Sequence, residues 1–248
     1  MSTLPCANWR ASSRSRTSPS AKEHPLPETD FSTLLPKIWN ALLETLVMVT
    51  GAFIAAAVLG VLLGHVVYAT RAGNLLQNAT VFTVINAVVN IVRPVPFIIV
   101  AVALIPVTRI VMGSSIGPVA AIFPLALVAS VAIARIAESN LVAVDPGVVE
   151  AGAAMGVRPW RVLFTIVIPE ALGPLALGLT YIFVALVDAT AVAGVIGGGG
   201  LGNLAMTYGY QRFDWVTMFI VIAVLIAIVQ LAQFAGNRIA RLVMHEGR

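Results

Sequence analysis

Long apolar runs, separated by short polar or glycine-rich segments, fill the chain after its first three dozen residues. The runs cover residues 39–68, 81–107, 117–138, 170–196 and 215–235. Each is long enough to cross a bilayer as a helix, which needs about 20 residues at 1.5 Å per residue. The pattern therefore predicts an all-α polytopic membrane protein with five transmembrane helices. An odd number of spans places the two termini on opposite sides of the membrane.

Two of these runs contain residues that predict their packing or shape. Ala56, Gly60 and Gly64 recur every four residues in the first run, a spacing of small side chains that lets membrane helices approach closely. The second run contains Arg93-Pro94-Val95-Pro96. Proline lacks the backbone N–H that a helix needs, so we expect a break or kink here within the membrane.

Ionisable residues are rare within the runs. Arg135 and Glu138 lie three residues apart at the end of the third run, where we expect an ion pair at the membrane interface. Arg93 and Asp188 lie deeper, and we consider both as residues of a possible translocation path. For Asp188 the alternatives are a structural ion pair with Arg93 or a protonated carboxyl group bonded to a neighbouring helix.

Polar segments flank the apolar region. Residues 1–36 are rich in Ser, Pro, Arg and Thr and lack the apolar core of a secretory signal peptide, so we expect a disordered tail. Residues 37–242 form the predicted membrane domain, and residues 243–248 form a short cytoplasmic tail. With 59% hydrophobic and 10% charged residues, and a mean hydropathy of +0.95, the chain is far more apolar than soluble domains, which are about 25% charged.

The net charge of +4 indicates membrane topology, and no nucleic-acid partner is expected. The two sides of the predicted bundle differ in their positive residues. One side carries Arg71, Arg135, Arg158, Arg161, Arg238, Arg241 and Arg248, and the other carries Arg109 and Arg212. The positive-inside rule makes the first side cytoplasmic, which predicts an outside N-terminus and a cytoplasmic C-terminus. Cys6 is the one cysteine, so no disulfide can form within the chain, and no metal or cofactor is expected.

A polar, glycine-punctuated segment, residues 145–169, separates the third and fourth runs. Asp145 suits a helix N-cap, Pro146 suits the first helical position, and Gly156 can adopt the left-handed conformation that ends a helix. These signals predict a helix of about ten residues, which is too short to cross a bilayer. It should lie outside the membrane.

This segment reads Glu150-Ala151-Gly152-Ala153-Ala154-Met155-Gly156, then nine residues, then Pro169 at the end of Ile166-Val167-Ile168-Pro169. It resembles the loop of permease subunits of bacterial ABC importers. Gly152 replaces the usual second alanine, and Ile168 replaces a leucine. The resemblance implies a coupling helix that docks into an ATPase subunit, with Glu150, Ala151, Gly152, Ala154, Met155, Gly156 and Pro169 as the coupling residues. An ordinary amphipathic connector is the alternative.

Residues 37–241 also resemble the family of methionine-uptake permeases. Shared segments include Glu44-Thr45-Leu46, Pro96-Phe97-Ile98-Ile99, Gly199-Gly200-Leu201-Gly202 and Gln233-Phe234-Ala235-Gly236. The resemblance implies a homodimer in the lipid bilayer, two cytoplasmic ATPase subunits and an extracytoplasmic substrate-binding protein that delivers D- or L-methionine. It also implies the inner membrane and alternating access. Asp188 departs from the family, which is usually uncharged there. A permease for another small polar solute is the alternative.

Other classes of function are less well supported. Gly197, Gly199 and Gly202 match a dinucleotide-binding pattern, but no strand precedes them, and we expect a flexible external turn that contacts a partner or substrate. The chain lacks a Walker A motif, so ATP hydrolysis must belong to a partner. An intramembrane enzyme is another alternative, but the sequence contains no H-E-x-x-H motif and its three histidines are widely separated. A purely structural membrane protein would leave the 150–169 pattern unexplained.

Overall fold

The computed structural model describes residues 31–74 and 77–246, and it is helical with no strand among them. This confirms the predicted all-α class. The elements are α1 (Phe31–Thr70), α2 (Ala79–Val92), α3 (Phe97–Ala103), α4 (Ile105–Met112), α5 (Pro118–Val142), α6 (Pro146–Ala154), α7 (Pro159–Val162), η1 (Leu163–Val167), α8 (Ile168–Ala193), η2 (Gly194–Gly198), α9 (Gly200–Leu204), η3 (Ala205–Tyr210) and α10 (Trp215–Glu246).

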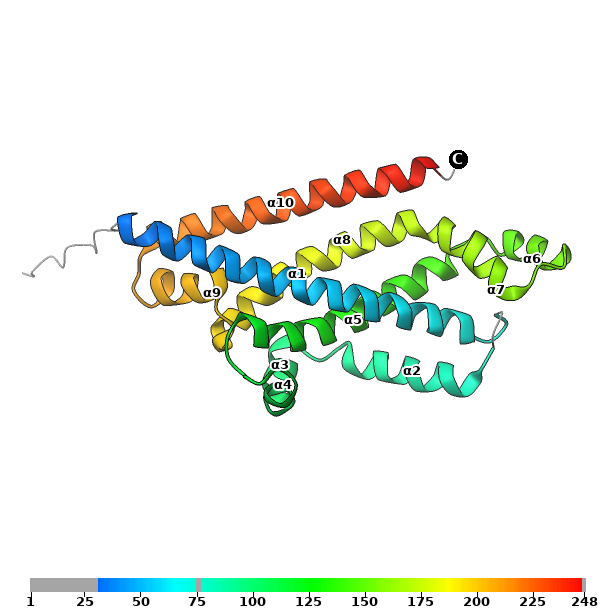
Figure 1. The fold of residues 1–248 in the computed structure, drawn as a ribbon, viewed down its shortest axis with the longest axis horizontal. Helices are drawn as coiled ribbons and strands as arrows, with labels where there is room; N and C mark the ends of the chain where they lie inside the picture. The colour runs from blue at the N-terminus through cyan, green and yellow to red at the C-terminus, as the bar shows by residue number, and fades with distance from the viewer. Residues whose placement is uncertain (1–30, 75–76, 247–248) are drawn as a thin grey trace, which may run out of the picture.

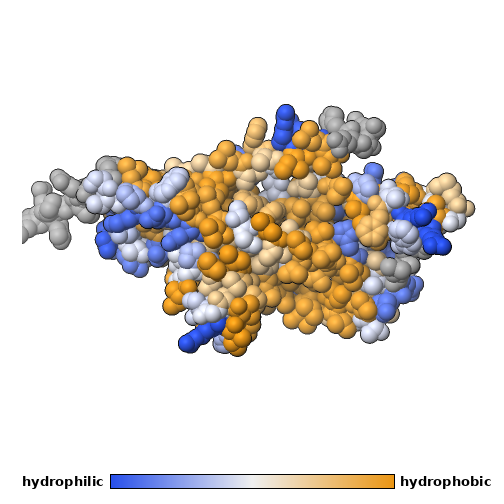
Figure 2. Space-filling model, viewed as in Figure 1, coloured by the Kyte–Doolittle hydropathy of each residue, from blue (hydrophilic) through white to orange (hydrophobic). Residues whose placement is uncertain are grey.

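Four stretches are long and apolar enough to cross a membrane: Ser32–Thr70, Pro118–Val142, Trp160–Gly198 and Trp215–Met244. The pair Ala79–Val92 and Phe97–Ala103 passes the same test together but is bent by 105°, so it is either a broken span or a re-entrant loop. The structure therefore has four candidate spans, or the predicted five when the bent pair is one span. The long helices run side by side along one axis (Figure 1), and hydrophilic residues gather toward the two ends of a broad apolar region (Figure 2).

The bend between α2 and α3 lies at the predicted Arg93–Pro96 break. The Arg93 N–H still donates to the Val89 carbonyl at 3.1 Å, and the Val95 N–H donates to the Val92 carbonyl at 3.1 Å. The prolines at 94 and 96 cannot continue this ladder because neither has a backbone N–H. As a result, α3 and α4 leave the direction of α2 and pack across the side of the bundle (Figure 1).

Helices α1 and α5 form the most extensive contact of the core, through the predicted small-residue stripe. Ala56 is fully buried. A Cβ atom at Gly60 would lie 2.6 Å from the Ile133 Cβ, and one at Gly64 would lie 2.6 Å from the Ala134 carbonyl oxygen. Neither approach leaves room for a side chain, so the helix-packing interpretation of the stripe is confirmed.

A polar cluster joins α1, α2 and α5 close to the loop that carries α6. The Glu138 side chain is buried, and its carboxylate lies 2.5 Å from Arg135 Nη1 and 3.8 Å from Arg71 Nη1. Arg135 also donates to the Asn86 side-chain oxygen at 3.3 Å. The predicted Arg135–Glu138 pair is therefore present, and it is part of a larger network that ties three spans together.

The two ends of the described chain lie at opposite ends of the bundle (Figure 1). We call these the α9 end, where α1 begins, and the α6 end, where α10 finishes. Helix α1 begins at Phe31 and α10 ends at Glu246, so helical structure extends a few residues beyond 37–242 on both sides. The expected disorder of the N-terminal tail up to residue 30 lies outside the described residues, as do Cys6 and Arg248.

The glycine-rich segment 194–202 differs from its prediction. It forms η2 and the start of α9, and Gly198, Gly200 and Gly202 are buried. A Cβ atom at Gly194 would lie 2.6 Å from the Gly199 carbonyl oxygen, so the chain folds tightly on itself here. The segment packs against α1 and α8, so the expected flexible turn is wrong, whereas its place outside the membrane and its contact with a partner or substrate stay predictions.

Candidate functional site

Helix α6 begins as the sequence predicts. The Gly147 N–H donates to the Asp145 side-chain oxygen at 2.8 Å, and the Val148 N–H donates to the Asp145 main-chain oxygen at 3.2 Å. Asp145 thus satisfies two of the amide groups that a helix start leaves without partners. Pro146, the first residue of the helix, lacks an amide that would need one.

The end of α6 is fixed by backbone geometry. Gly156 has φ +72°, which is the left-handed conformation. The Val157 N–H donates to the Gly152 carbonyl at 3.2 Å, which is the six-to-one hydrogen bond of a Schellman motif. The chain therefore turns sharply after Met155, as the glycine predicted, and leads back toward α7.

The structure explains why glycine stands at position 152, where the usual pattern of this loop has alanine. It is buried, and a Cβ atom there would lie 3.1 Å from Val162 Cγ2 and 3.6 Å from Ile166 Cδ1. An alanine would need these side chains to shift by a few tenths of an ångström. Gly152 lets α6 pack closely against the segment that leads into α8.

A small apolar core anchors this loop to the spans. It is formed by buried residues from α1, α5, the α5–α6 connection, α7, η1 and α8: Tyr68, Ala69, Leu141, Val144, Val162, Leu163, Val167 and Ala171. Pro169, exposed at the start of α8, follows the π-helical turn η1, in which the Ile168 N–H donates to the Leu163 carbonyl. A loop attached this way should move together with the ends of α1, α5 and α8.

The exposed surface of the loop carries four of the seven residues that the pattern assigned to coupling. Glu150, Ala151, Ala154 and Met155 are exposed, with Met155 at 73%. Trp160 and Phe164 are also exposed, at 49% and 63%. We call these six residues the coupling surface. Large exposed apolar side chains commonly mark a protein interface. Gly152 is buried, whereas Gly156 and Pro169 are exposed, and these three residues shape the backbone of the loop.

Sequence reasoning did not identify Trp160 or Phe164. The coupling pattern leaves the residues between its glycine and its final proline unspecified, so it gave no signal there. A cue exists in the composition, because Trp160 and Phe164 are large apolar residues that lie close to Arg158 and Arg161, next to the loop that carries α6. The Arg161 guanidinium lies 5.4 Å from the centre of the Trp160 ring, which fits a cation–π contact.

Asp188 lies near the end of α8 that adjoins η2, on an exposed face of the helix. It lines a groove of about 300 Å³ between α8 and α10. Arg93 is exposed at the α2–α3 break and does not line this groove. The ion pairs among the described residues both involve Glu138, so the structure does not bring Asp188 and Arg93 together as the structural alternative expected.

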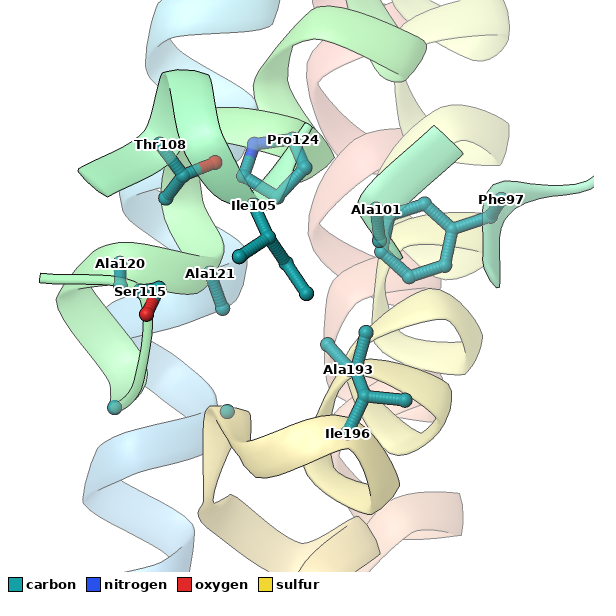
Figure 3. A pocket seen from close by; sticks show the side chains of 12 residues that line it. Phe97, Ala101, Ile105, Thr108, Ser115, Ala120, Ala121, Pro124, Ala193 and Ile196 are labelled. Atoms are coloured by element: carbon teal, nitrogen blue, oxygen red, sulfur yellow. The ribbon is translucent and has the colours of Figure 1, made fainter. Parts of the chain in front are cut away.

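A second cavity lies where α3 and α4 pack against α5 and η2 (Figure 3). The Ile105 side chain projects into it, and Ala193 and Ile196 lie across from it (Figure 3). Thr108 is buried, and its hydroxyl oxygen has no hydrogen-bond partner among the described residues. The cavity measures about 30 Å³, far below the roughly 300 Å³ or more of small-molecule sites, so it cannot hold an amino acid.

Residues 113–117 read Gly-Ser-Ser-Ile-Gly, which matches the G-x-S-x-G pattern of serine hydrolases. That motif requires a strand-to-helix turn, whereas this segment joins α4 to α5. The serine at the centre of the motif is Ser115, which lines the small cavity beside Thr108. His65, a candidate base on α1, instead contacts the Val61 carbonyl at 2.6 Å. The segment therefore lacks the structural context of a nucleophile.

Comparison with known proteins gives a consistent result. Residues 60–243 match the family described as "binding-protein-dependent transport system inner membrane component". The chain is 40% identical over 212 residues to a probable D-methionine transport system permease protein of Vibrio cholerae, covering 86% of this chain and 92% of that protein. It is 39% identical over 209 residues to the methionine import system permease protein of Bacillus subtilis, covering 84% and 94%.

Solved structures agree. A chain of the MetNI methionine ABC transporter in an inward-facing conformation superposes with a TM-score of 0.82 at 38% identity. The match covers 85% of this chain and 98% of that chain. The family match, residues 60–243, includes the loop that carries α6.

Proposed function

Because the chain belongs to the family of binding-protein-dependent transport system inner membrane components, we propose that it is the permease subunit of an ABC importer for D- or L-methionine. It is a multi-pass inner-membrane protein. The methionine assignment rests on relatives from two distant bacteria, both named as methionine permeases and both matched over more than nine-tenths of their length. A permease for another small polar solute is the alternative.

The observation that carries the transport role is the construction of the 145–169 loop. A capped short helix with an exposed apolar face stands outside the spans, and it is anchored to three of them through a buried core. A loop anchored in this way can transmit movement of a soluble ATPase subunit to the membrane helices. We propose that the coupling surface docks on an ATPase subunit and that ATP is hydrolysed there.

The proposed assembly contains two copies of this chain, two ATPase subunits and an extracytoplasmic binding protein. Exposed apolar residues along α10, such as Phe219, Ile226, Leu231 and Phe234, leave ample surface for lipid and a second permease. The proposed orientation places the α6 end in the cytoplasm and the α9 end outside. Arg158 and Arg161 at the α6 end favour this orientation under the positive-inside rule.

Transport by this assembly would proceed by alternating access. ATP binding draws the ATPase subunits together, the coupling loops follow, and the spans turn so that the path opens to one side at a time. Each ligand shifts the conformational equilibrium only by its difference in affinity for the two states. Asp188 and Arg93 are the path residues we propose, because both are ionisable and exposed on the single chain.

Uptake by a reconstituted complex tests this function. Vesicles containing the permease and its ATPase, supplied with binding protein and ATP, should accumulate radiolabelled methionine. Omitting the ATPase, the binding protein or ATP should abolish accumulation. Accumulation of a different solute in place of methionine would favour the alternative permease. ATP hydrolysis by the permease chain alone would contradict the assignment of ATP hydrolysis to a partner.

A further inference from the structure

The groove that contains Asp188 has a distinctive lining. Six aliphatic side chains and two polar ones, Asp188 and Gln230, enclose about 300 Å³ between α8 and α10. The aliphatic residues are Val184, Val187, Ala191, Leu225, Ile226 and Val229. The groove thus has an apolar lining with one carboxylate and one amide, and its volume lies within the range of small-molecule sites.

The Asp188 carboxylate needs an explanation of its own. It lies within the span Trp160–Gly198, and it forms no ion pair with any described residue. A carboxylate that faces lipid is strongly unfavourable, so residues of this kind usually face water, a partner helix or a transported solute. Its side of α8 also carries Tyr181 and Ala185, which are exposed on the single chain. Because a carboxylate facing lipid is unfavourable, we expect this side of α8 to face water, a partner helix or a solute.

The three described cavities differ in what they could bind. The cavity beside Thr108 is too small for an amino acid. A groove of about 350 Å³ near Phe53 has Thr180 as its one polar side chain, and that hydroxyl donates to the Ala176 carbonyl at 2.8 Å. Of the three, the Asp188 groove alone combines adequate volume with a charged side chain free to pair with a ligand.

We propose that the Asp188 groove is a transient binding site for an amino acid with a free ammonium group and an apolar side chain. Asp188 accepts hydrogen bonds from the ammonium, the Gln230 amide donates to the carboxylate of the solute, and the aliphatic residues contact its side chain. This inference rests on the proposed transport function and deepens it. A site of this composition disfavours sugars, anions and amino acids whose nitrogen is acylated.

Equilibrium binding to the full permease–ATPase complex tests the proposal without the binding protein. The complex is placed in nanodiscs of phosphatidylglycerol and titrated with radiolabelled L-methionine. We expect Asp188→Asn to weaken binding by about tenfold or more, since a charge-assisted hydrogen bond is lost. Asp188→Glu should restore much of it. The matched control is Glu170→Gln, which removes an exposed carboxylate from the other end of α8.

Competition on the wild-type complex gives a second readout that does not depend on a variant folding. N-acetylmethionine and 4-(methylthio)butanoate lack the ammonium and should compete at least about tenfold less well than methionine. Equal competition by these analogues, or unchanged binding in Asp188→Asn, would overturn the proposal. Displacement of methionine by added phosphatidylethanolamine would instead assign the groove to a lipid amine.

Uptake assays keep this inference separate from the proposed function. If wild-type vesicles accumulate methionine and Asp188→Asn vesicles do so equally well, with equal binding, the groove assignment fails while the transport function stands. If wild-type vesicles accumulate no methionine, the proposed function itself fails.

Discussion

The backbone N–H of Gly200 donates a 2.7 Å hydrogen bond to the Glu44 carboxylate, which lies 156 residues earlier in the chain. The next amide, that of Leu201, donates to the Thr45 hydroxyl at 2.9 Å, and this hydroxyl donates to the Ala41 carbonyl of its own helix. Two adjacent side chains of α1 therefore cap the start of α9. Gly200 has φ +75°, and a Cβ atom there would lie 2.6 Å from the Thr45 hydroxyl.

We predict that Glu44→Ala destabilises the α9 end. It removes the acceptor of a partly buried amide, which typically costs about 1–3 kcal/mol of unfolding free energy. Thermal unfolding of the purified complex measures the effect. Glu44→Gln is the control, because its side-chain oxygen can still accept the hydrogen bond and most of the stability should return. Equal unfolding temperatures for Glu44→Ala and wild type would show that the cap contributes little.

Gly156→Val should leave the protein inserted in the membrane while uncoupling ATP hydrolysis from uptake. No atom lies within 4 Å of a Cβ atom at Gly156, so the effect comes from backbone strain and not from a clash. A left-handed residue with a Cβ costs about 1–2 kcal/mol, which would redirect the chain after α6. The measurements are ATPase activity and methionine uptake in the same vesicles.

Gly156→Asn provides the matched comparison for the previous variant. Asparagine tolerates the left-handed conformation much better than valine does, so coupling should be largely retained. If both variants transport like wild type, the shape of this turn does not matter for coupling.

Glu150→Ala should weaken binding of the ATPase subunit without changing the stability of the permease. Glu150 is exposed, and it forms no hydrogen bond or ion pair with a described residue, so its removal costs the fold almost nothing. Co-purification of the ATPase, alongside thermal unfolding of the permease, separates the two effects. Glu170→Ala, which lies outside the coupling surface, serves as the control. Normal co-purification of the ATPase with the Glu150→Ala variant would show that Glu150 does not contribute to the interface.

Glu138→Ala should destabilise the α6 end by about 1–3 kcal/mol. The variant removes the shared partner of Arg71 and Arg135, although both guanidinium groups are partly exposed and water offsets some of the loss. Denaturation of the complex provides the measurement, with Glu138→Gln expected to be intermediate. A substitution without effect would mean that solvent satisfies both arginines equally well.

Much of the fold and of the coupling site was predictable because the signals are local. Asp145 and Gly156 fix the ends of α6 through hydrogen bonds that span at most five residues. Pro94 breaks α2 through its own missing amide, whatever packs nearby. Features of this kind depend on backbone chemistry that a short stretch of sequence contains.

Contacts between distant segments were not predictable in the same way. The glycine-rich segment appears flexible in sequence because glycine permits many conformations, yet Glu44 and Thr45 hold Gly200 in one of them. Likewise, nothing in the order of residues could decide whether Asp188 and Arg93 meet. That depends on how α8 and the α2–α3 break are placed in the bundle.

The contact between Glu44 and Gly200 also sets an order of events during synthesis. At roughly 5–20 residues per second, a ribosome takes about 8–30 s to add the 156 residues that separate them. Throughout that interval, the first span carries a carboxylate whose amide partner has not yet been made. Closure of the α9 end is therefore a late step of biogenesis that must wait for α8 to insert. A nascent chain that stops before Gly200 lacks the amide to which Glu44 is bonded in the folded protein.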